Sequence, residues 1–188
     1  MNIHAPIRDF LQQQTIRSLV EPGQGEGDYI KAGVIPFLRE NPSRYYVMKP
    51  RAKLPELGAP PFQICKGTRM QLVPNIGWRD IKEEGMRAPI MESLAETALR
   101  EGIEELGVRL DNIKALIDIG PFGFSSATTG RSKSMWLFAA EMKNEKDFLP
   151  DNSIAETTAE RQWMPLSEFT VVGREDHRYI LETIQSKL

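Results

Sequence analysis

The strongest pattern of apolar and polar positions runs from Glu92 to Val108, ESLAETALREGIEELGV. At about 100° per residue in a helix, Glu101, Glu104 and Glu105 fall within roughly 100° of arc on one face. The apolar set gathers on the opposite face: Ala95, Leu99, Gly102, Ile103 and Leu106. The pattern therefore predicts a helix with a core side and a carboxylate side.

Short β-prone runs lie on both sides of this helix. Before it we expect strands at Tyr29–Leu38, Arg44–Ala52 and Pro61–Met70, the last running into a turn at Lys66-Gly67. After it we expect strands at Ile113–Ile119 and Ser134–Met142, a short strand through Trp163, and a helix from about Glu175. Residues 120–131 and 143–153 are expected to be loops. With few helices between the strands, the predicted class is α+β.

The first 28 residues are predicted to form an arm, and residues 29–188 the folded domain. Pro6 to Leu19 has the apolar spacing of a short amphipathic helix, and the glycine-rich stretch Glu21–Gly27 reads as a linker. The sequence leaves two arrangements open: the arm packs on its own domain, or on the second subunit of a homodimer. A long insertion containing Trp78 separates Gly67 from the main helix.

Composition narrows the class of protein. A chain of 188 residues with a net charge of -2 is one domain of ordinary size and offers no basic surface for nucleic acid. Cys65 is the single cysteine, which excludes a disulfide framework and favours a reducing cytoplasm. No apolar run approaches the length of a membrane span, and the N-terminus lacks the apolar core of a signal peptide.

Carboxylates clustered on one helix face indicate a cation site. Glu101, Glu104 and Glu105 repel one another, and a bound cation would reverse the sign of that interaction. Magnesium and manganese are hard ions that prefer oxygen ligands, so either ion suits this set. The competing interpretation is a solvated acidic stripe, which is common on helices.

The spacing resembles the Nudix box of the Nudix hydrolases, written G-x5-E-x7-R-E-U-x-E-E-x-G-U with U aliphatic. Seven positions of the motif match: Glu92, Arg100, Glu101, Glu104, Glu105, Gly107 and Val108. Two positions depart from it. The opening glycine is expected at Met86 but the nearest is Gly85, and the first aliphatic position is Gly102.

The resemblance implies an α/β/α sandwich with a mixed sheet over roughly residues 29 to 188. It also implies a Mg²⁺- or Mn²⁺-dependent hydrolase that cleaves a nucleoside diphosphate linked to another moiety, with Glu101, Glu104 and Glu105 as metal ligands. Many members carry a further metal-binding or basic glutamate in a later loop. Glu156 is the better match to it, while Glu160 reads also as an exposed strand residue.

Several other residues have predicted roles. Arg100 is expected to brace the acidic face, with Glu96 as its i,i+4 partner, although a plain surface ion pair is the alternative. Gly107 reads as a left-handed C-cap, and Gly102 predicts a close neighbour, an aromatic side chain between Phe122 and Trp136 being one candidate. The candidate phosphate-binding residues are Lys66, Arg69, Arg131 and Lys133.

Three functions remain after these observations. The first is a pyrophosphohydrolase, and the weak likeness of Lys66-Gly67 to the dinucleoside polyphosphate branch suggests one substrate class. The second is a Nudix-like domain that binds a nucleotide as a sensor without cleaving it. The third is an interaction protein with an incidental acidic helix. The intact pairs Arg100-Glu101 and Glu104-Glu105 favour the first, because a sensor has no need to keep every metal ligand.

Overall fold

The computed structural model describes residues 3–20, 29–52, 58–82, 90–125 and 132–188, apart from the side chains of residues 124, 125, 132 and 133. A seven-stranded mixed sheet forms its centre, in the order β1-β7-β8-β2-β3-β9, with β4 also paired to β2. The strands are β1 (Arg17–Ser18), β2 (Lys31–Leu38), β3 (Asn41–Pro50), β4 (Cys65–Thr68), β7 (Ile113–Ser125), β8 (Ser132–Met142) and β9 (Thr158–Pro165). The pairs β1–β7 and β2–β8 are parallel, and the other pairs are antiparallel.

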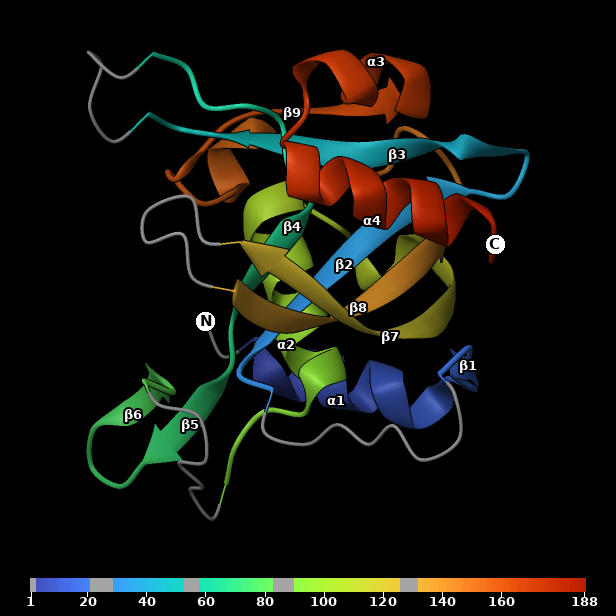
Figure 1. Ribbon diagram of the computed structural model, residues 1–188. Helices are drawn as coiled ribbons and strands as arrows, with labels where there is room; N and C mark the ends of the chain where they lie inside the picture. The colour runs from blue at the N-terminus through green and yellow to red at the C-terminus, as the bar shows by residue number, and fades with distance from the viewer. Residues whose placement is uncertain (1–2, 21–28, 53–57, 83–89, 126–131) are drawn as a thin grey trace.

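Helices cover both faces of this sheet (Figure 1). One face carries α1 (His4–Gln13) and α2 (Leu94–Glu101), and the other carries α3 (Leu166–Val172) and α4 (Glu175–Gln185). After Lys31, strand β2 has no polar side chain because both of its faces are buried: Val34 belongs to the core under α2, and Ile35 to the core under α4. The predicted α+β class and α/β/α sandwich are confirmed.

The helix that carries the residues matching the Nudix box, here called the box helix, changes from α-helical to π-helical geometry midway. Ser93 begins it with a capping box, in which its side chain accepts from Glu96 N and the Glu96 carboxylate accepts from Ser93 N. After Glu101 the backbone continues as a π-helix, η2 (Gly102–Leu106), which ends at Gly107 with φ of 69°. Gly107 is thus the left-handed C-cap that the sequence predicts. A π-helical turn widens the helix, and such turns are frequent at functional sites.

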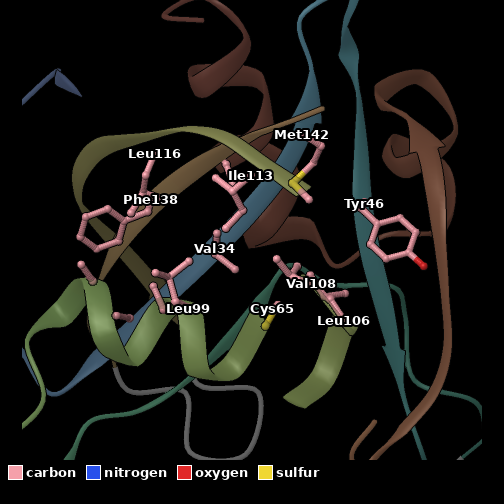
Figure 2. Close-up of a cluster of buried hydrophobic side chains, with 14 of the residues drawn as sticks. Val34, Tyr46, Cys65, Leu99, Leu106, Val108, Ile113, Leu116, Phe138 and Met142 are labelled. Atoms are coloured by element: carbon pink, nitrogen blue, oxygen red, sulfur yellow. The ribbon is translucent and has the colours of Figure 1, made fainter. Parts of the chain in front are cut away.

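Gly102 lies where α2 crosses β2. A Cβ placed there would lie 2.6 Å from Val34 Cγ1, so the close neighbour is a β-branched side chain of the sheet. The suggestion of an aromatic neighbour was wrong, because Gly102 faces the middle strand β2. Figure 2 shows this contact region, with Leu99 of α2 pointing toward Val34.

Other differences from the expected elements lie outside the box. The insertion forms a hairpin, β5 (Met70–Val73) and β6 (Gly77–Asp80), which projects beyond the main sheet (Figure 1). Lys66 and Gly67 form part of strand β4 and make no turn, because β4 pairs with β2 through both residues. Residues 120–125, expected to be a loop, extend β7 along β8. Helix α3 was not predicted, and the 3₁₀ turns η3 (Leu110–Asn112) and η4 (Asp151–Ser153) complete the elements.

The N-terminal segment packs on its own chain. Helix α1 begins two residues before the predicted helix and ends at Gln13, after which β1 joins the sheet edge beside β7. Ile7 of α1 is fully buried in the core beneath α2. Residues 21–28 lie outside the described part of the chain, so the division at residue 28 stays a prediction. No described helix is long and apolar enough to cross a membrane.

Candidate functional site

Strand β4 lies directly against the carboxylate face of the box helix. The Glu101 carboxylate fills the space beside Gly67, where an added Cβ would lie 1.7 Å from Glu101 Oε1. The Glu105 carboxylate accepts hydrogen bonds from the Lys66 backbone N–H and the Cys65 thiol. Because any larger residue at position 67 would displace Glu101, this glycine is part of the site's construction.

Arg100 connects three carboxylates, those of Glu92, Glu101 and Glu104. The Arg100 side chain is buried, and its Nε donates to Glu92 Oε1 at 2.7 Å. Its Nη1 donates to Glu101 Oε1 at 2.7 Å and to Glu104 Oε2 at 2.9 Å, and its Nη2 donates to Thr68 O at 2.7 Å. A planar fork with five donors suits such an arrangement, which a lysine could not reproduce.

Glu96, the predicted partner of Arg100, is engaged elsewhere. Its carboxylate closes the capping box at Ser93 and accepts a hydrogen bond from Arg8 Nε. Glu92, the residue before the N-cap Ser93, is the partner of Arg100 instead. The bracing geometry therefore exists with a different partner, which helical spacing could not identify because Glu92 lies outside the helix.

Glu101 and Glu105 differ from Glu104 in their surroundings: the first two are largely buried, and the third is more exposed. Burial raises the pKa of Glu101 to about 7, with Glu105 and Glu104 adding to the rise and Arg100 opposing it. Burial also raises the pKa of Glu105, whose Oε2 is buried without a hydrogen-bond partner. Glu104 is the accessible member of the set, with a side chain 44% exposed. The raised pKa values of Glu101 and Glu105 mean that the folded protein disfavours negative charge on these two side chains.

Glu101, Glu104 and Glu105 offer the oxygen ligands that a divalent cation prefers, although their carboxylates do not converge on one point. Within the described ranges, no three acidic, cysteine or histidine side chains are spaced as a preformed metal cage. Arg100 Nη1 instead holds Glu101 and Glu104 together by charge. The unsatisfied Oε2 of Glu105 and the repulsion among the carboxylates are what a cation with oxygen ligands would relieve.

The predicted phosphate-binding residues are placed differently from one another. Lys66 follows Cys65 in the strand, so its side chain points to the α4 side of β4. There, burial and the neighbouring Arg174 lower its pKa to about 8. Arg69 is buried and donates to the carbonyls of Glu92 and Tyr29, so we leave it out of the phosphate-binding set. Arg131 and the Lys133 side chain lie outside the described residues.

The segment around Glu156 wraps the C-terminal end of the box helix. Ala155 N donates to Glu104 O at 2.6 Å, and Thr158 Oγ1 donates to Glu105 O at 3.2 Å. Glu156 lies between them with an exposed side chain. Glu160, by contrast, lies on β9 with its carboxylate 4.0 Å from Lys49 Nζ. Of the two glutamates, Glu156 is thus the one whose loop touches the box.

Sequence reasoning missed the residues that hold the box from outside. His4 Nδ1 lies 3.3 Å from Glu92 Oε1, and its ring stacks on Trp78 with the centroids 3.9 Å apart. Arg161 donates to Leu106 O at the other end of the box helix. No local pattern connects His4 or Arg161 to the box, since the contacts join segments far apart in the sequence.

Comparison with solved structures supports the fold. No protein-family profile matches this sequence, and no curated protein matches it either. A NUDIX hydrolase from Nitrosomonas europaea superposes with a TM-score of 0.57 at 13% identity, covering 85% of this chain and 89% of that chain.

Two further proteins add complexes with ligands. The NUDIX domain of Shewanella oneidensis NrtR complexed with ADP ribose has a TM-score of 0.56 at 15% identity, over 96% of this chain and 97% of that chain. NrtR complexed with a 27mer DNA has a TM-score of 0.52 at 17% identity, over 84% and 61% of the two chains. A bifunctional NMN adenylyltransferase/ADP ribose pyrophosphatase from Francisella tularensis, complexed with AMP and a Mn ion, has a TM-score of 0.54 at 12% identity, over 99% of this chain and 46% of that chain.

At these identities the likeness concerns the fold. The mixed sheet, the helices on both faces and the box helix lying across β2 and β4 are all present in this chain. The protein has the Nudix fold.

Proposed function

We propose that this protein is a divalent-cation-dependent hydrolase that cleaves a nucleoside diphosphate linked to another moiety. One observation carries the proposal: Glu105 presents a buried carboxylate oxygen without a hydrogen-bond partner, and beside it the partly buried carboxylate of Glu101 has a pKa raised to about 7. A folded protein that confines negative charge in this way gains most from a bound cation.

Glu101, Glu104 and Glu105 would hold Mg²⁺ or Mn²⁺. The ion, when bound, neutralises charge on phosphoryl oxygens and lowers the pKa of a bound water. Without it, the same carboxylates would repel a pyrophosphate. Glu104 is the residue free to move, because its half-exposed side chain can leave Arg100 while the less exposed Glu101 keeps its contact. Arg100 then remains as the brace that fixes the direction of the acidic face.

Three other residues would supply the remaining roles. Lys66 and Arg131 are our candidates for phosphate contacts, Lys66 because its ammonium group is near enough to Glu105 for that carboxylate to oppose the lowering of its pKa by burial and Arg174. Glu156 is our candidate for the base or a further metal ligand, because its loop is hydrogen bonded to the backbone of Glu104 and Glu105. The complexes of neighbouring folds with ADP ribose, and with AMP and a Mn ion, support the nucleotide class of substrate.

Nucleotide sensing without hydrolysis is the alternative. The NrtR complexes, with ADP ribose in one and DNA in the other, concern a Nudix fold with more than one kind of partner. Two features favour hydrolysis in this chain: Glu101, Glu104 and Glu105 are all retained, and Arg100 connects two of them. A sensor needs neither.

A substrate panel tests the proposal. The protein is incubated with Mg²⁺ and capped substrates that resist phosphatase, namely ADP-ribose, dinucleoside polyphosphates and nucleotide sugars, and phosphate is measured after phosphatase coupling. We expect turnover of at least one class, its loss in excess chelator, and its recovery with Mg²⁺ or Mn²⁺. Binding of a nucleotide by calorimetry with no turnover would support the sensor. Turnover that persists in chelator would contradict the proposed role of the metal.

A further inference from the structure

Two residues of α1, one helical turn apart, contact two residues one turn apart at the start of the box. His4 Nδ1 lies 3.3 Å from Glu92 Oε1, and Arg8 Nε donates to Glu96 Oε1. The indole of Trp78, on β6 of the inserted hairpin, covers both: it stacks on the His4 ring and lies 5.5 Å from the Arg8 guanidinium carbon. Helix α1 and the hairpin thus meet at the acids that begin the box helix.

The hairpin is itself attached to the segment that carries Glu92. Met70 N donates to Glu92 Oε2 at 2.9 Å, and Glu92 N donates to Met70 O at 2.9 Å. A further backbone bond joins Leu72 N to Ile90 O. The backbone of β5 therefore hydrogen bonds to Glu92 on one side, and the His4 ring lies beside its other carboxylate oxygen.

His4 and Arg100 both lie next to the same carboxylate oxygen of Glu92. Glu92 Oε1 accepts from Arg100 Nε at 2.7 Å and faces His4 Nδ1 at 3.3 Å. Burial lowers the pKa of His4, so the imidazole is neutral at pH 7 and contributes polarity without a second full charge. Glu92 and Arg100 are both buried, so a shift of this oxygen would be transmitted to the guanidinium.

We propose that His4 is a positioning residue of the catalytic site, acting through Glu92 and Arg100 to fix the directions of Glu101 and Glu104. The inference rests on the proposed function for its activity readout. Helix α1 would then help to orient the carboxylates of Glu101 and Glu104. The connection runs from Trp78 through His4, Glu92 and Arg100 to the metal-binding carboxylates, each step being a contact given above.

Two substitutions at His4 separate the polar contact from ring packing. His4→Phe keeps an aromatic ring against Trp78 and removes Nδ1, whereas His4→Asn keeps an amide nitrogen near the position of Nδ1 and removes the ring. We expect His4→Phe to lower kcat roughly 10-fold, the size typical for groups that orient metal ligands, with KM little changed. His4→Asn is expected to recover most of that loss.

Phe10→Ala is the matched control, because Phe10 packs α1 on the same core and its apolar side chain can make no polar contact with Glu92. We expect it to lower the unfolding midpoint while kcat stays within about 2-fold of the unmodified protein, an effect of packing alone. If His4→Phe is as active as the unmodified protein, or if Phe10→Ala loses as much kcat as His4→Phe, the positioning role is wrong.

A spectroscopic readout keeps this test independent of the proposed function. The Arg100 Nε–H resonance reports its hydrogen bond to Glu92 in the absence of substrate or metal. We expect its solvent exchange to accelerate at least 10-fold in His4→Phe, and to stay near the unmodified rate in His4→Asn and Phe10→Ala. Unchanged exchange in His4→Phe would overturn the inference. If the unmodified protein hydrolyses nothing, the proposed function fails and this resonance still decides the role of His4.

Discussion

The two halves of the box helix treat their carboxylates in opposite ways. Glu92, at the entrance of the α-helical half, is fully buried and accepts from Met70 N, Thr97 Oγ1 and Arg100. Glu105, in the π-helical half, is also largely buried but leaves one oxygen without a partner. Both are carboxylates of one continuous motif, yet one is satisfied within the fold and the other is not.

The difference indicates a division of labour along the helix. The first half is a fixed support, because every polar group that it buries near Arg100 has a partner. Glu101, the last residue of the α-helical half, and Glu105, in the π-helical half, both have a pKa raised by burial, so the fold disfavours their charged forms. An unsatisfied buried group is unfavourable for stability, so a ligand that satisfies it is the simplest explanation for its presence.

The largest expected effect comes from breaking the supporting half. Glu92→Gln removes the fully buried one of the two carboxylates nearest the Arg100 guanidinium, and we expect a loss of about 3–5 kcal/mol in the free energy of unfolding. Urea denaturation followed by circular dichroism measures it. Glu182→Gln, an exposed glutamate on α4, is the control and should change stability by less than about 0.5 kcal/mol. Equal stability of the two variants would contradict a supporting role for Glu92.

Breaking the second half should affect catalysis and leave the fold intact. We expect Glu104→Gln and Glu105→Gln each to lower kcat by about 100-fold or more, because each removes charge from the proposed metal site. Without metal, the stability of Glu105→Gln should hold or rise slightly, since carboxylate repulsion is relieved. Steady-state kinetics measures the change in kcat, and urea denaturation measures the change in stability. An unchanged kcat in both variants would mean that these carboxylates are not metal ligands.

The pH dependence of stability tests whether the pKa of Glu101 is raised in the folded protein. The folded pKa of Glu101 is about 7 against an ordinary value of 4.5, so between these pH values the folded state holds a proton that the unfolded state releases. Stability of the metal-free protein should therefore fall as the pH rises from about 4.5 to 7, by on the order of 1–3 kcal/mol. Glu105 acts in the same direction. Glu101→Gln should flatten this slope, and Glu182→Gln should keep it; a slope unchanged in Glu101→Gln would contradict the raised pKa.

The smallest expected effect is at the junction of the halves. Gly102→Leu would push the helix away from Val34, costing on the order of 1–3 kcal/mol. A gain of about 1 kcal/mol in helix propensity offsets part of it. Because Glu101 is next in the chain, kcat should fall with stability. Gly102→Ala should be milder in both respects. Two variants that are more stable and equally active would show that close packing at Gly102 is unimportant.

The sequence predicted the fold where the pattern was local. The apolar face of the box helix, the buried strand at Tyr29–Leu38 and the C-terminal helix each follow from the periodicity of neighbouring residues, and each is found. The left-handed Gly107 was predictable for the same reason, because a helix end that needs positive φ selects glycine.

The support of the box could not be predicted in this way. Glu92 binds Arg100 from outside the helix, so helical spacing pointed to Glu96. His4 reaches Glu92 only because β1, the sheet and α2 bring α1 beside the box, a matter of topology that no window of sequence contains. Within the predicted strand Pro61–Met70, Lys66-Gly67 was wrongly read as a turn because glycine usually marks one, whereas here Gly67 makes room for the Glu101 carboxylate.

The most direct test is a titration of the metal-free protein with Mn²⁺, in which electron paramagnetic resonance measures the free ion. We expect the unmodified protein and Glu182→Gln to bind Mn²⁺ alike, and Glu105→Gln to bind at least about 10-fold more weakly. Saturating Mn²⁺ should also raise the unfolding midpoint of the first two proteins and not of Glu105→Gln. If the unmodified protein binds no Mn²⁺, or if Glu105→Gln binds it as tightly, the second half of the box helix is not a cation site.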